Sequence, residues 1–236
     1  MTGTLFDLAT LILPLVFAIV CHEVAHGAMA RLLGDRTAEE QGRLTLNPLP
    51  HVDPLGTVIL PGLLALTHLP VFGWAKPVPV NQWRLRNPRW GMMLVAAAGP
   101  GSNLLLAGLA AVGLGLLARA GVMAGVSDSG AATALAAFTI ANLVNFLSIN
   151  LFLALFNLLP IPPFDGSHIF EGLLPRGLAR RYAGIRRGGM LLVILLLVVL
   201  PWLIPGFDPV RRLVGPVFDW LSRYYLALAD LVAGGH

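Results

Sequence analysis

Long apolar stretches recur along the chain, and most are close to the length that a helix needs to cross a membrane. Hydrophobic residues dominate at about 5–33, 90–117, 132–158, 189–203 and 213–232, with proline, glycine or charged residues at most of the ends. A bilayer core is about 30 Å thick and takes roughly 20 apolar residues as a helix. The pattern therefore predicts an all-α integral membrane protein.

The region between the first two of these stretches has a different pattern. Residues 57–69 are mostly apolar, but Pro54, Pro61 and Pro70 interrupt the run. Proline breaks helices, and irregular backbone lies at membrane depth only where protein or water shelters it. We expect a re-entrant or hairpin segment over about 54–72, although a short span also fits. The prediction is one domain, 1–236, with a bundle of five to six transmembrane helices.

Composition agrees with a membrane environment. Hydrophobic residues make up 56% of the 236 positions and charged residues 12%, which is about half the charged share of an average soluble domain. The sequence pI is near 10.0 and the mean hydropathy is +0.77. The basic residues lie in short loops between apolar runs, so we expect a lipid bilayer and no nucleic acid as partner. Cys21 is the single cysteine, which excludes an internal disulfide and a cysteine-rich zinc module.

The basic residues are unevenly distributed among the loops, and this predicts an orientation. The regions 34–89 and 159–187 carry six and five Lys or Arg residues, whereas 118–131 carries Arg119 alone. Short cytoplasmic loops are enriched in Lys and Arg. We therefore expect both rich regions in the cytoplasm and the N-terminus outside. The expected location is the plasma membrane of a prokaryotic cell.

Ionisable residues interrupt the first apolar stretch. His22, Glu23 and His26 form the pattern HExxH. On a helix, positions four apart share a face, so both imidazoles can reach one metal ion. Zinc accepts imidazole and carboxylate ligands and leaves a position for water, whose proton Glu23 can take. The pattern also occurs by chance in soluble helices, but ionisable side chains inside a membrane helix are costly and mark functional sites.

A third protein ligand must come from elsewhere in the chain. The candidates are His51, Asp53, His68, Asp165, His168 and Glu171. Asp165 follows a proline-rich stretch at the end of a long apolar run, and Gly166 permits an unusual backbone, so its carboxylate could turn inward at membrane depth. The same residues fit an Asp-Gly turn or a helix cap equally well. His51 and Asp53 are interpreted as a turn, because Pro50 and Pro54 flank them.

Several motifs occur in order between about 8 and 170. They are HEVAHG at 22–27, GRLTLNP at 42–48 with HVDPLG at 51–56, FGWAKPVPVN at 72–81, AGPGSN at 98–103, and NLLPIPPFDG at 157–166. No single motif is specific. Together they resemble the site-2 protease family of intramembrane zinc metalloproteases, in its compact branch without PDZ or CBS domains.

The resemblance implies a role for each matching residue. It implies that Asp165 joins His22 and His26 around one Zn²⁺ per chain and that Glu23 is the catalytic acid and base. It further implies that Asn103 and Asn157 lie near the active site and hold substrate. The expected substrate is a membrane protein cut in or near a transmembrane segment. The catalytic core is then about 5–170, followed by C-terminal helices at about 189–232.

Other interpretations of the same residues remain open. Asn103 and Asn157 also fit as hydrogen-bonding residues between helices. Buried histidines and an aspartate would serve a membrane metal transporter or sensor, and a proteolytically silent relative could bind membrane proteins without cutting them. A carboxylate between the two histidines favours hydrolysis over transport, because transport has no need of a base beside the metal.

Overall fold

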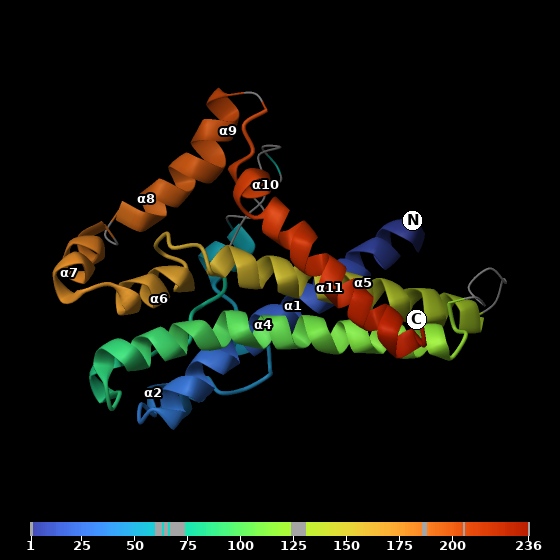
Figure 1. Cartoon of the computed structure of the whole chain (residues 1–236), viewed down its shortest axis with the longest axis horizontal. Coiled ribbons are helices and arrows are strands. Elements are labelled where there is room, and N and C mark those ends of the chain that lie inside the picture. Colours follow the sequence, from blue (N-terminus) through green and yellow to red (C-terminus); the bar gives the residue numbers. More distant parts are fainter. Residues whose placement is uncertain are drawn as a thin grey trace.

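The computed structural model describes residues 2–59, 63, 66, 74–123, 131–185, 188–204 and 206–235 (Figure 1). The three longest helices are α1 (Thr2–Leu32), α4 (Pro88–Arg119) and α5 (Ala131–Asn157). Between α1 and α4 lie α2 (Thr37–Glu40), η1 (Leu49–His51), η2 (Pro54–Ile59) and η3 (Gln82–Arg84). No described residue belongs to a strand, so the predicted all-α class is confirmed.

The chain after α5 forms shorter helices. These are α6 (Asp165–Leu173), α7 (Arg176–Ile185), α8 (Gly189–Ile194), η6 (Leu195–Val199), α9 (Leu200–Leu203), α10 (Pro209–Leu213) and α11 (Gly215–Ala233). The apolar stretch expected at 189–203 is helical, but η6 interrupts it with a π-turn just before Pro201. Proline has no N–H to donate to the preceding turn and its ring crowds the carbonyl there, which accounts for the irregular turn.

Three of the helices are long and apolar enough to cross a membrane. They are Leu5–Leu32, Pro88–Arg119 and Ala132–Asn157, and the bent pair Arg176–Gly184 with Gly189–Leu203 gives a fourth if it is one span. At 1.5 Å per residue, each of the three exceeds the roughly 30 Å of a bilayer core. The predicted count of five to six is not confirmed among the described residues. Most of the expected re-entrant segment at 54–72 lies outside them.

Helix α4 lies at the centre of the bundle. Figure 1 shows it alongside α1 and α5, and α11 crosses over α4 and α5. A stripe of small residues on α4, Ala107, Ala110 and Ala111, packs against Leu147 and Leu151 of α5. Small side chains let membrane helices approach closely. Lipid is as apolar as the helix surfaces, so close packing holds the helices together where the hydrophobic effect does not.

Polar side chains lie inside this bundle and apolar side chains lie on its outer surface. Asn103 and Asn150 are fully buried, whereas Leu105 and Leu109 of α4 are 74% and 66% exposed. Exposed leucines on a helix of this length suit contact with lipid. The buried amides therefore occupy the protein interior at membrane depth, which is also where the HExxH face of α1 lies.

Candidate metal centre

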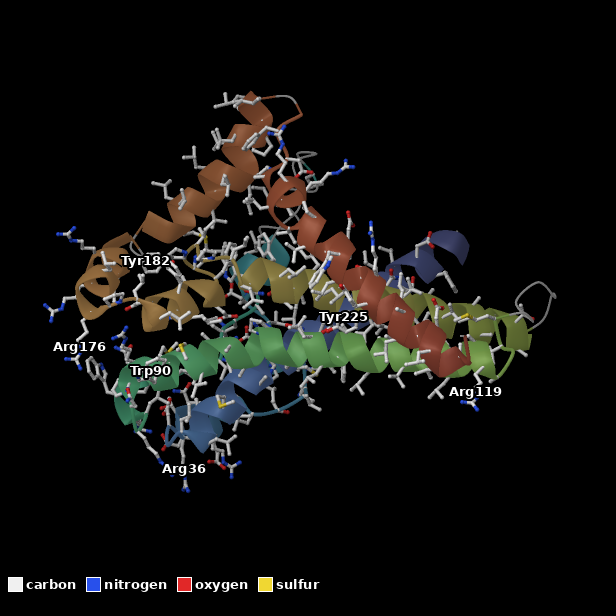
Figure 2. The ribbon with its side chains drawn as sticks, viewed as in Figure 1. Arg36, Trp90, Arg119, Arg176, Tyr182 and Tyr225 are labelled. Carbon is white, nitrogen blue, oxygen red and sulfur yellow. The ribbon has the colours of Figure 1, made fainter. Side chains whose placement is uncertain are left out.

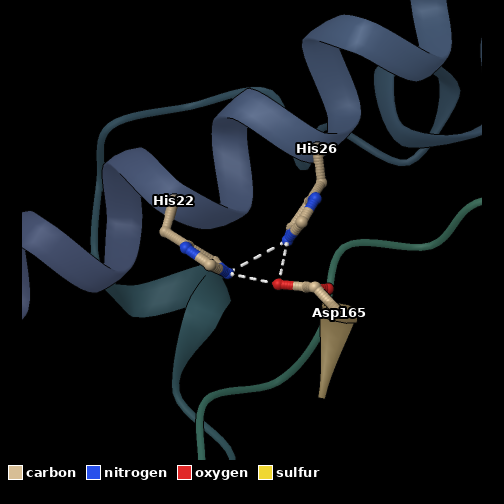
Figure 3. Close-up of side chains that lie close together, drawn as sticks. All are labelled: His22, His26 and Asp165. Carbon is tan, nitrogen blue, oxygen red and sulfur yellow. Dashed lines mark hydrogen bonds and ion pairs between the residues drawn. The ribbon is translucent and has the colours of Figure 1, made fainter. Parts of the chain in front are cut away.

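The regular turn of α1 brings the two histidines of the HExxH pattern together. His22 and His26 are separated by one helical turn, and their Nε2 atoms lie 3.0 Å apart (Figure 3). Both residues are buried, with 7% and 9% of their surface exposed. The spacing in the sequence thus produces the shared face that the pattern predicts.

Asp165 approaches the same point from the opposite side as the first residue of α6. Its Oδ2 lies 3.1 Å from His22 Nε2 and 3.2 Å from His26 Nε2. The proline-rich stretch ends α5, and Gly166 lets the chain return closely, because a Cβ there would collide with the carbonyl group of Leu158. Of the third-ligand candidates within the described residues, Asp165 is the one that joins the two histidines.

Hydrogen bonds at the far side of each imidazole fix which nitrogen faces the cluster. His22 Nδ1 lies 2.6 Å from the side-chain oxygen of Asn103. His26 Nδ1 lies 2.7 Å from the carbonyl oxygen of Val95. Because both oxygens act as acceptors here, both Nδ1 atoms carry the proton, and the Nε2 lone pairs point toward Asp165. Carbonyl and amide oxygens commonly orient metal-binding histidines in this way.

The donor set fits a zinc ion. Zinc bonds to nitrogen and oxygen are about 2.0–2.2 Å long, so the corners of a tetrahedral site lie roughly 3.3–3.5 Å apart. The three observed separations, 3.0, 3.1 and 3.2 Å, need only a slight expansion to match. Asp165 Oδ2 is buried without a hydrogen-bond donor, and two Nε2 lone pairs face it. A cation satisfies all three atoms at once.

Glycine on α4 leaves the space that the imidazoles occupy. A Cβ at Gly99 would lie 2.7 Å or less from ring atoms of His22 and His26, so another residue there would displace both rings. The motif at 98–103 therefore supports the site at two positions. Gly99 admits the imidazoles, and Asn103, one turn further along α4, binds His22.

Glu23 lies on an adjacent face of the same helical turn, and its carboxylate has its own partner. Glu23 Oε2 accepts a hydrogen bond of 2.8 Å from the backbone N–H of Val78. Val78 belongs to a stretch without regular secondary structure before η3. A carboxylate held beside a metal site can receive and return protons, as hydrolysis requires.

The remaining candidates lie apart from this cluster. Asp53 accepts a hydrogen bond from the Gly56 N–H, which is a capped turn of the expected kind. His51 is buried and contacts the Thr45 carbonyl oxygen. His168 and Glu171 line a separate cavity of about 480 Å³ beside α7. His68 lies outside the described residues.

The two asparagines singled out in the sequence have different surroundings. Asn103 has no exposed surface, and its amide nitrogen donates to Asn150 and to the carbonyl oxygen of Ala18. Asn157 lies at the end of α5 and donates to Leu153 of the same helix. Asn150, which the sequence indicates only as a hydrogen-bonding residue between helices, extends the hydrogen bonds behind His22. Sequence reasoning missed Val78, although the pattern Pro-Val-Pro leaves a single backbone N–H there.

A helical membrane protein with a buried His–His–Asp cluster on an HExxH helix has the architecture of a membrane metalloprotease. The sequence model of peptidase family M50, the site-2 protease family, matches residues 10–200. The chain is 38% identical over 220 residues to "Putative zinc metalloprotease YwhC" of Bacillus subtilis, covering 89% of this chain and 92% of that protein.

A second relative supports the same assignment. The chain is 30% identical over 190 residues to "Putative zinc metalloprotease Rip2" of Mycolicibacterium smegmatis, covering 78% of this chain and 64% of that protein. No solved structure matches the chain significantly. The chain belongs to peptidase family M50. It is thus a membrane zinc metalloprotease with Zn²⁺ as cofactor, as the sequence motifs predict.

Proposed function

We propose that His22, His26 and Asp165 hold one zinc ion and that Glu23 is the general base and acid of peptide hydrolysis. The observation that supports this assignment is the convergence of two Nε2 atoms and one carboxylate oxygen within 3.2 Å of one another. Glu23 adjoins the first of these ligands on the same helix. Together they supply the ligands and the base that metal-assisted hydrolysis needs.

Zinc, when bound, polarises the substrate carbonyl and makes water more acidic. Glu23 takes a proton from the attacking water at a carboxylate oxygen as the water oxygen bonds to the carbonyl carbon. It then delivers that proton to the amide nitrogen as the carbon–nitrogen bond breaks. Asn103 and Val95 keep the imidazoles oriented throughout, because their oxygens bind the Nδ1 protons. We assign Asn103 this positioning role, and Asn157 a place at the substrate-binding side.

The proposed substrates are membrane proteins cut in or near a transmembrane segment. His22 and His26 are buried on a helix long enough to cross the membrane, and Asp165 meets them from the short helix α6, which favours a substrate that enters from the bilayer. We propose five to six membrane segments in a single domain, with α11 and part of 54–72 added to the spans described above. The core at about 5–170 contains every residue assigned to catalysis.

The orientation is proposed from the basic residues. Figure 2 shows Arg36 and Arg176 at the end of the bundle where Trp90 lies, near the start of α4, with Arg119 at the opposite end. Short loops rich in Lys and Arg stay in the cytoplasm. The end with Arg36 then faces the cytoplasm of a prokaryotic cell and the N-terminus lies outside. After Cys21→Ser, cysteines at Arg84 and Arg181 should react only with reagents on the cytoplasmic side. Labelling from outside would reverse the orientation.

Glu23→Gln tests the proposed chemistry, because glutamine keeps the size of the side chain but cannot accept the proton. The variant should keep one zinc ion, since the ligands are intact. Peptide cleavage should fall by the ~10²–10⁴-fold typical of losing a positioned acid or base.

New protein termini would be compared between membranes that contain wild-type enzyme and membranes that contain the Gln variant. A substrate found in this way would then be assayed in liposomes. Wild-type cleavage by zinc-loaded Glu23→Gln would refute the mechanism. Metal flux across the liposome membrane with no cleavage would favour a transporter.

A further inference from the structure

The residues Trp74–Asn81, called here the 74–81 segment, pass beside the HExxH turn of α1. The backbone N–H of Val78 donates to Glu23 Oε2 at 2.8 Å. Pro77 and Pro79 flank Val78 and have no N–H. The stretch Pro77–Pro79 therefore offers a single backbone donor, and that donor is bonded to the carboxylate proposed as the catalytic base.

Hydrogen bonds on both sides of Val78 hold the 74–81 segment in place. Before it, the Lys76 N–H donates to the His51 carbonyl oxygen at 2.9 Å, and Arg43 donates to the Lys76 carbonyl oxygen at 2.9 Å. After it, the Asn81 N–H donates to Asp35 Oδ2 at 2.6 Å. Arg43 and Asp35 are 8% and 0% exposed. Because Arg43 and Asp35 are charged, their hydrogen bonds to the segment are stronger than hydrogen bonds between neutral groups.

The side chain of Val78 brings the segment close to the helix. A Cβ at Gly27 would lie 2.9 Å from Val78 Cγ1, so the absence of a side chain at Gly27 makes room for the valine. Gly27 is one residue beyond the second histidine of the HExxH pattern. The backbone of the segment thus approaches α1 at the turn where Glu23 projects.

A fixed carboxylate suits proton transfer better than a freely rotating one. Glutamate has several rotatable bonds, and a general base works only when one of its oxygens is within hydrogen-bonding distance of the proton it accepts. The bond to Val78 uses Oε2, so Oε1 is the oxygen that can take the proton from water. A backbone N–H in this geometry donates only, so it holds the carboxylate without competing for the proton.

We infer that the Val78 N–H is a positioning group for the reaction, which holds Glu23 by one oxygen so that the other oxygen serves as the base. The inference rests on the role proposed for Glu23. It assigns the Pro-Val-Pro sequence a function in turnover that is separate from metal binding and from the packing of the valine side chain.

The test removes the N–H and leaves the side chain. The α-hydroxy analogue of valine, incorporated at position 78, replaces the amide by an ester. Val78→Ala does the opposite, because it keeps the N–H and removes the methyl groups. The same analogue at Val80 is the matched backbone control, since Val80 also follows a proline in the same segment but does not bind Glu23. Val78→Pro removes the N–H by mutation but also replaces the valine side chain, so it is compared with Val78→Ala.

Each protein would be assayed in full length, loaded with zinc, on a membrane-protein substrate cut by the wild-type enzyme. The ester at position 78 should lower kcat by roughly 10–100-fold, the range for losing one hydrogen bond to a charged group, with KM and zinc content unchanged. Val78→Ala, which keeps the N–H, should lose less kcat than the ester at position 78, and the ester at position 80 should stay near the wild-type kcat. In Glu23→Gln, where no base remains to be positioned, the ester at position 78 should cause no further loss.

A second measurement does not depend on activity. In protein labelled with ¹⁵N-valine, the signal missing from Val78→Ala identifies the Val78 amide. Its proton should shift upfield in Glu23→Gln, because a neutral amide is a weaker acceptor than a carboxylate. An unmoved signal would overturn the inference. Full kcat for the zinc-loaded ester at position 78, or an equal further loss in Glu23→Gln, would also overturn it. Failure of the role proposed for Glu23 would be distinct, since Glu23→Gln itself would then cleave normally.

Discussion

The HExxH turn is supported differently on its two sides. The imidazoles of His22 and His26 face helices α4 and α6, where Asn103, the Val95 carbonyl and Asp165 meet them. These partners belong to helices, and the backbone hydrogen bonds within each helix keep the partners in position. The carboxylate of Glu23 faces the 74–81 segment, which has no regular secondary structure and is held by the side chains of Arg43 and Asp35 and by the backbone of η1 and η2.

This difference separates two kinds of damage. A change among the helical partners should release zinc, because the ligands lose their geometry. A change that affects the 74–81 segment should leave zinc bound and slow the reaction, because only the base is displaced. Measuring metal content and turnover on the same samples therefore distinguishes the two sides of the site.

The largest effect is expected from Asp165→Ala. Two protein ligands remain, so zinc affinity should fall by more than the ~10–100-fold typical of losing an outer hydrogen-bonding partner, and cleavage should be lost with it. Metal content by atomic emission, followed during dialysis against a chelator, measures the change. His168→Ala on the same short helix is the control and should retain zinc. Normal zinc content in Asp165→Ala would mean that the third ligand has been misassigned.

Much of the fold could be predicted because hydrophobic length is a strong signal in membranes. The ends of α4 and α5 fall within about two residues of the expected ranges, which is the usual uncertainty of helix boundaries. The interruption at η6 was not predicted, although Pro201 stands in the sequence. Proline marks where a helix is strained, but whether the chain bends, shifts its hydrogen bonds or stops depends on neighbouring elements.

The candidate site was predictable in part for a similar reason. His22, Glu23 and His26 are close in sequence, so helical geometry alone brings them together. Asp165 is more than a hundred residues away, and spacing left its role open until the resemblance was considered. The Val78 N–H and the Val95 carbonyl belong to the backbone, so their positions depend on tertiary packing that residue type does not encode.

A smaller effect is expected from Asn103→Ala, which tests how much the helical partners of the histidines contribute to zinc binding. His22 would lose the oxygen that binds its Nδ1 proton, and the ring would no longer be fixed. Loss of such an outer partner typically lowers metal affinity ~10–100-fold. Competition with a zinc-binding dye measures the change. Asn142→Ala is the matched control, because Asn142 donates to Phe138 of its own helix. Equal affinities for the two variants would argue against the positioning role.

The smallest effect is expected from Asp35→Asn, which addresses the other side of the comparison. Burial acts to raise the pKa of Asp35, but hydrogen bonds from Thr37 and from the Asn81 N–H, with the charge of Arg84, hold the pKa below its ordinary value of 3.8. A group whose pKa is lower in the folded state stabilises the protein at pH values above its pKa in the unfolded state. That stabilisation is lost as the pH falls through its pKa in the folded state. Wild-type protein should therefore lose thermal stability below about pH 4, whereas Asp35→Asn should lose less over this range and should be less stable at neutral pH by about 1–3 kcal/mol. Differential scanning fluorimetry in detergent across pH 3–7 gives both quantities.

Because Asp35 fixes the 74–81 segment and touches no proposed ligand, the variant should retain zinc while kcat declines. Zinc loss in Asp35→Asn would mean that the two sides of the HExxH turn do not act separately.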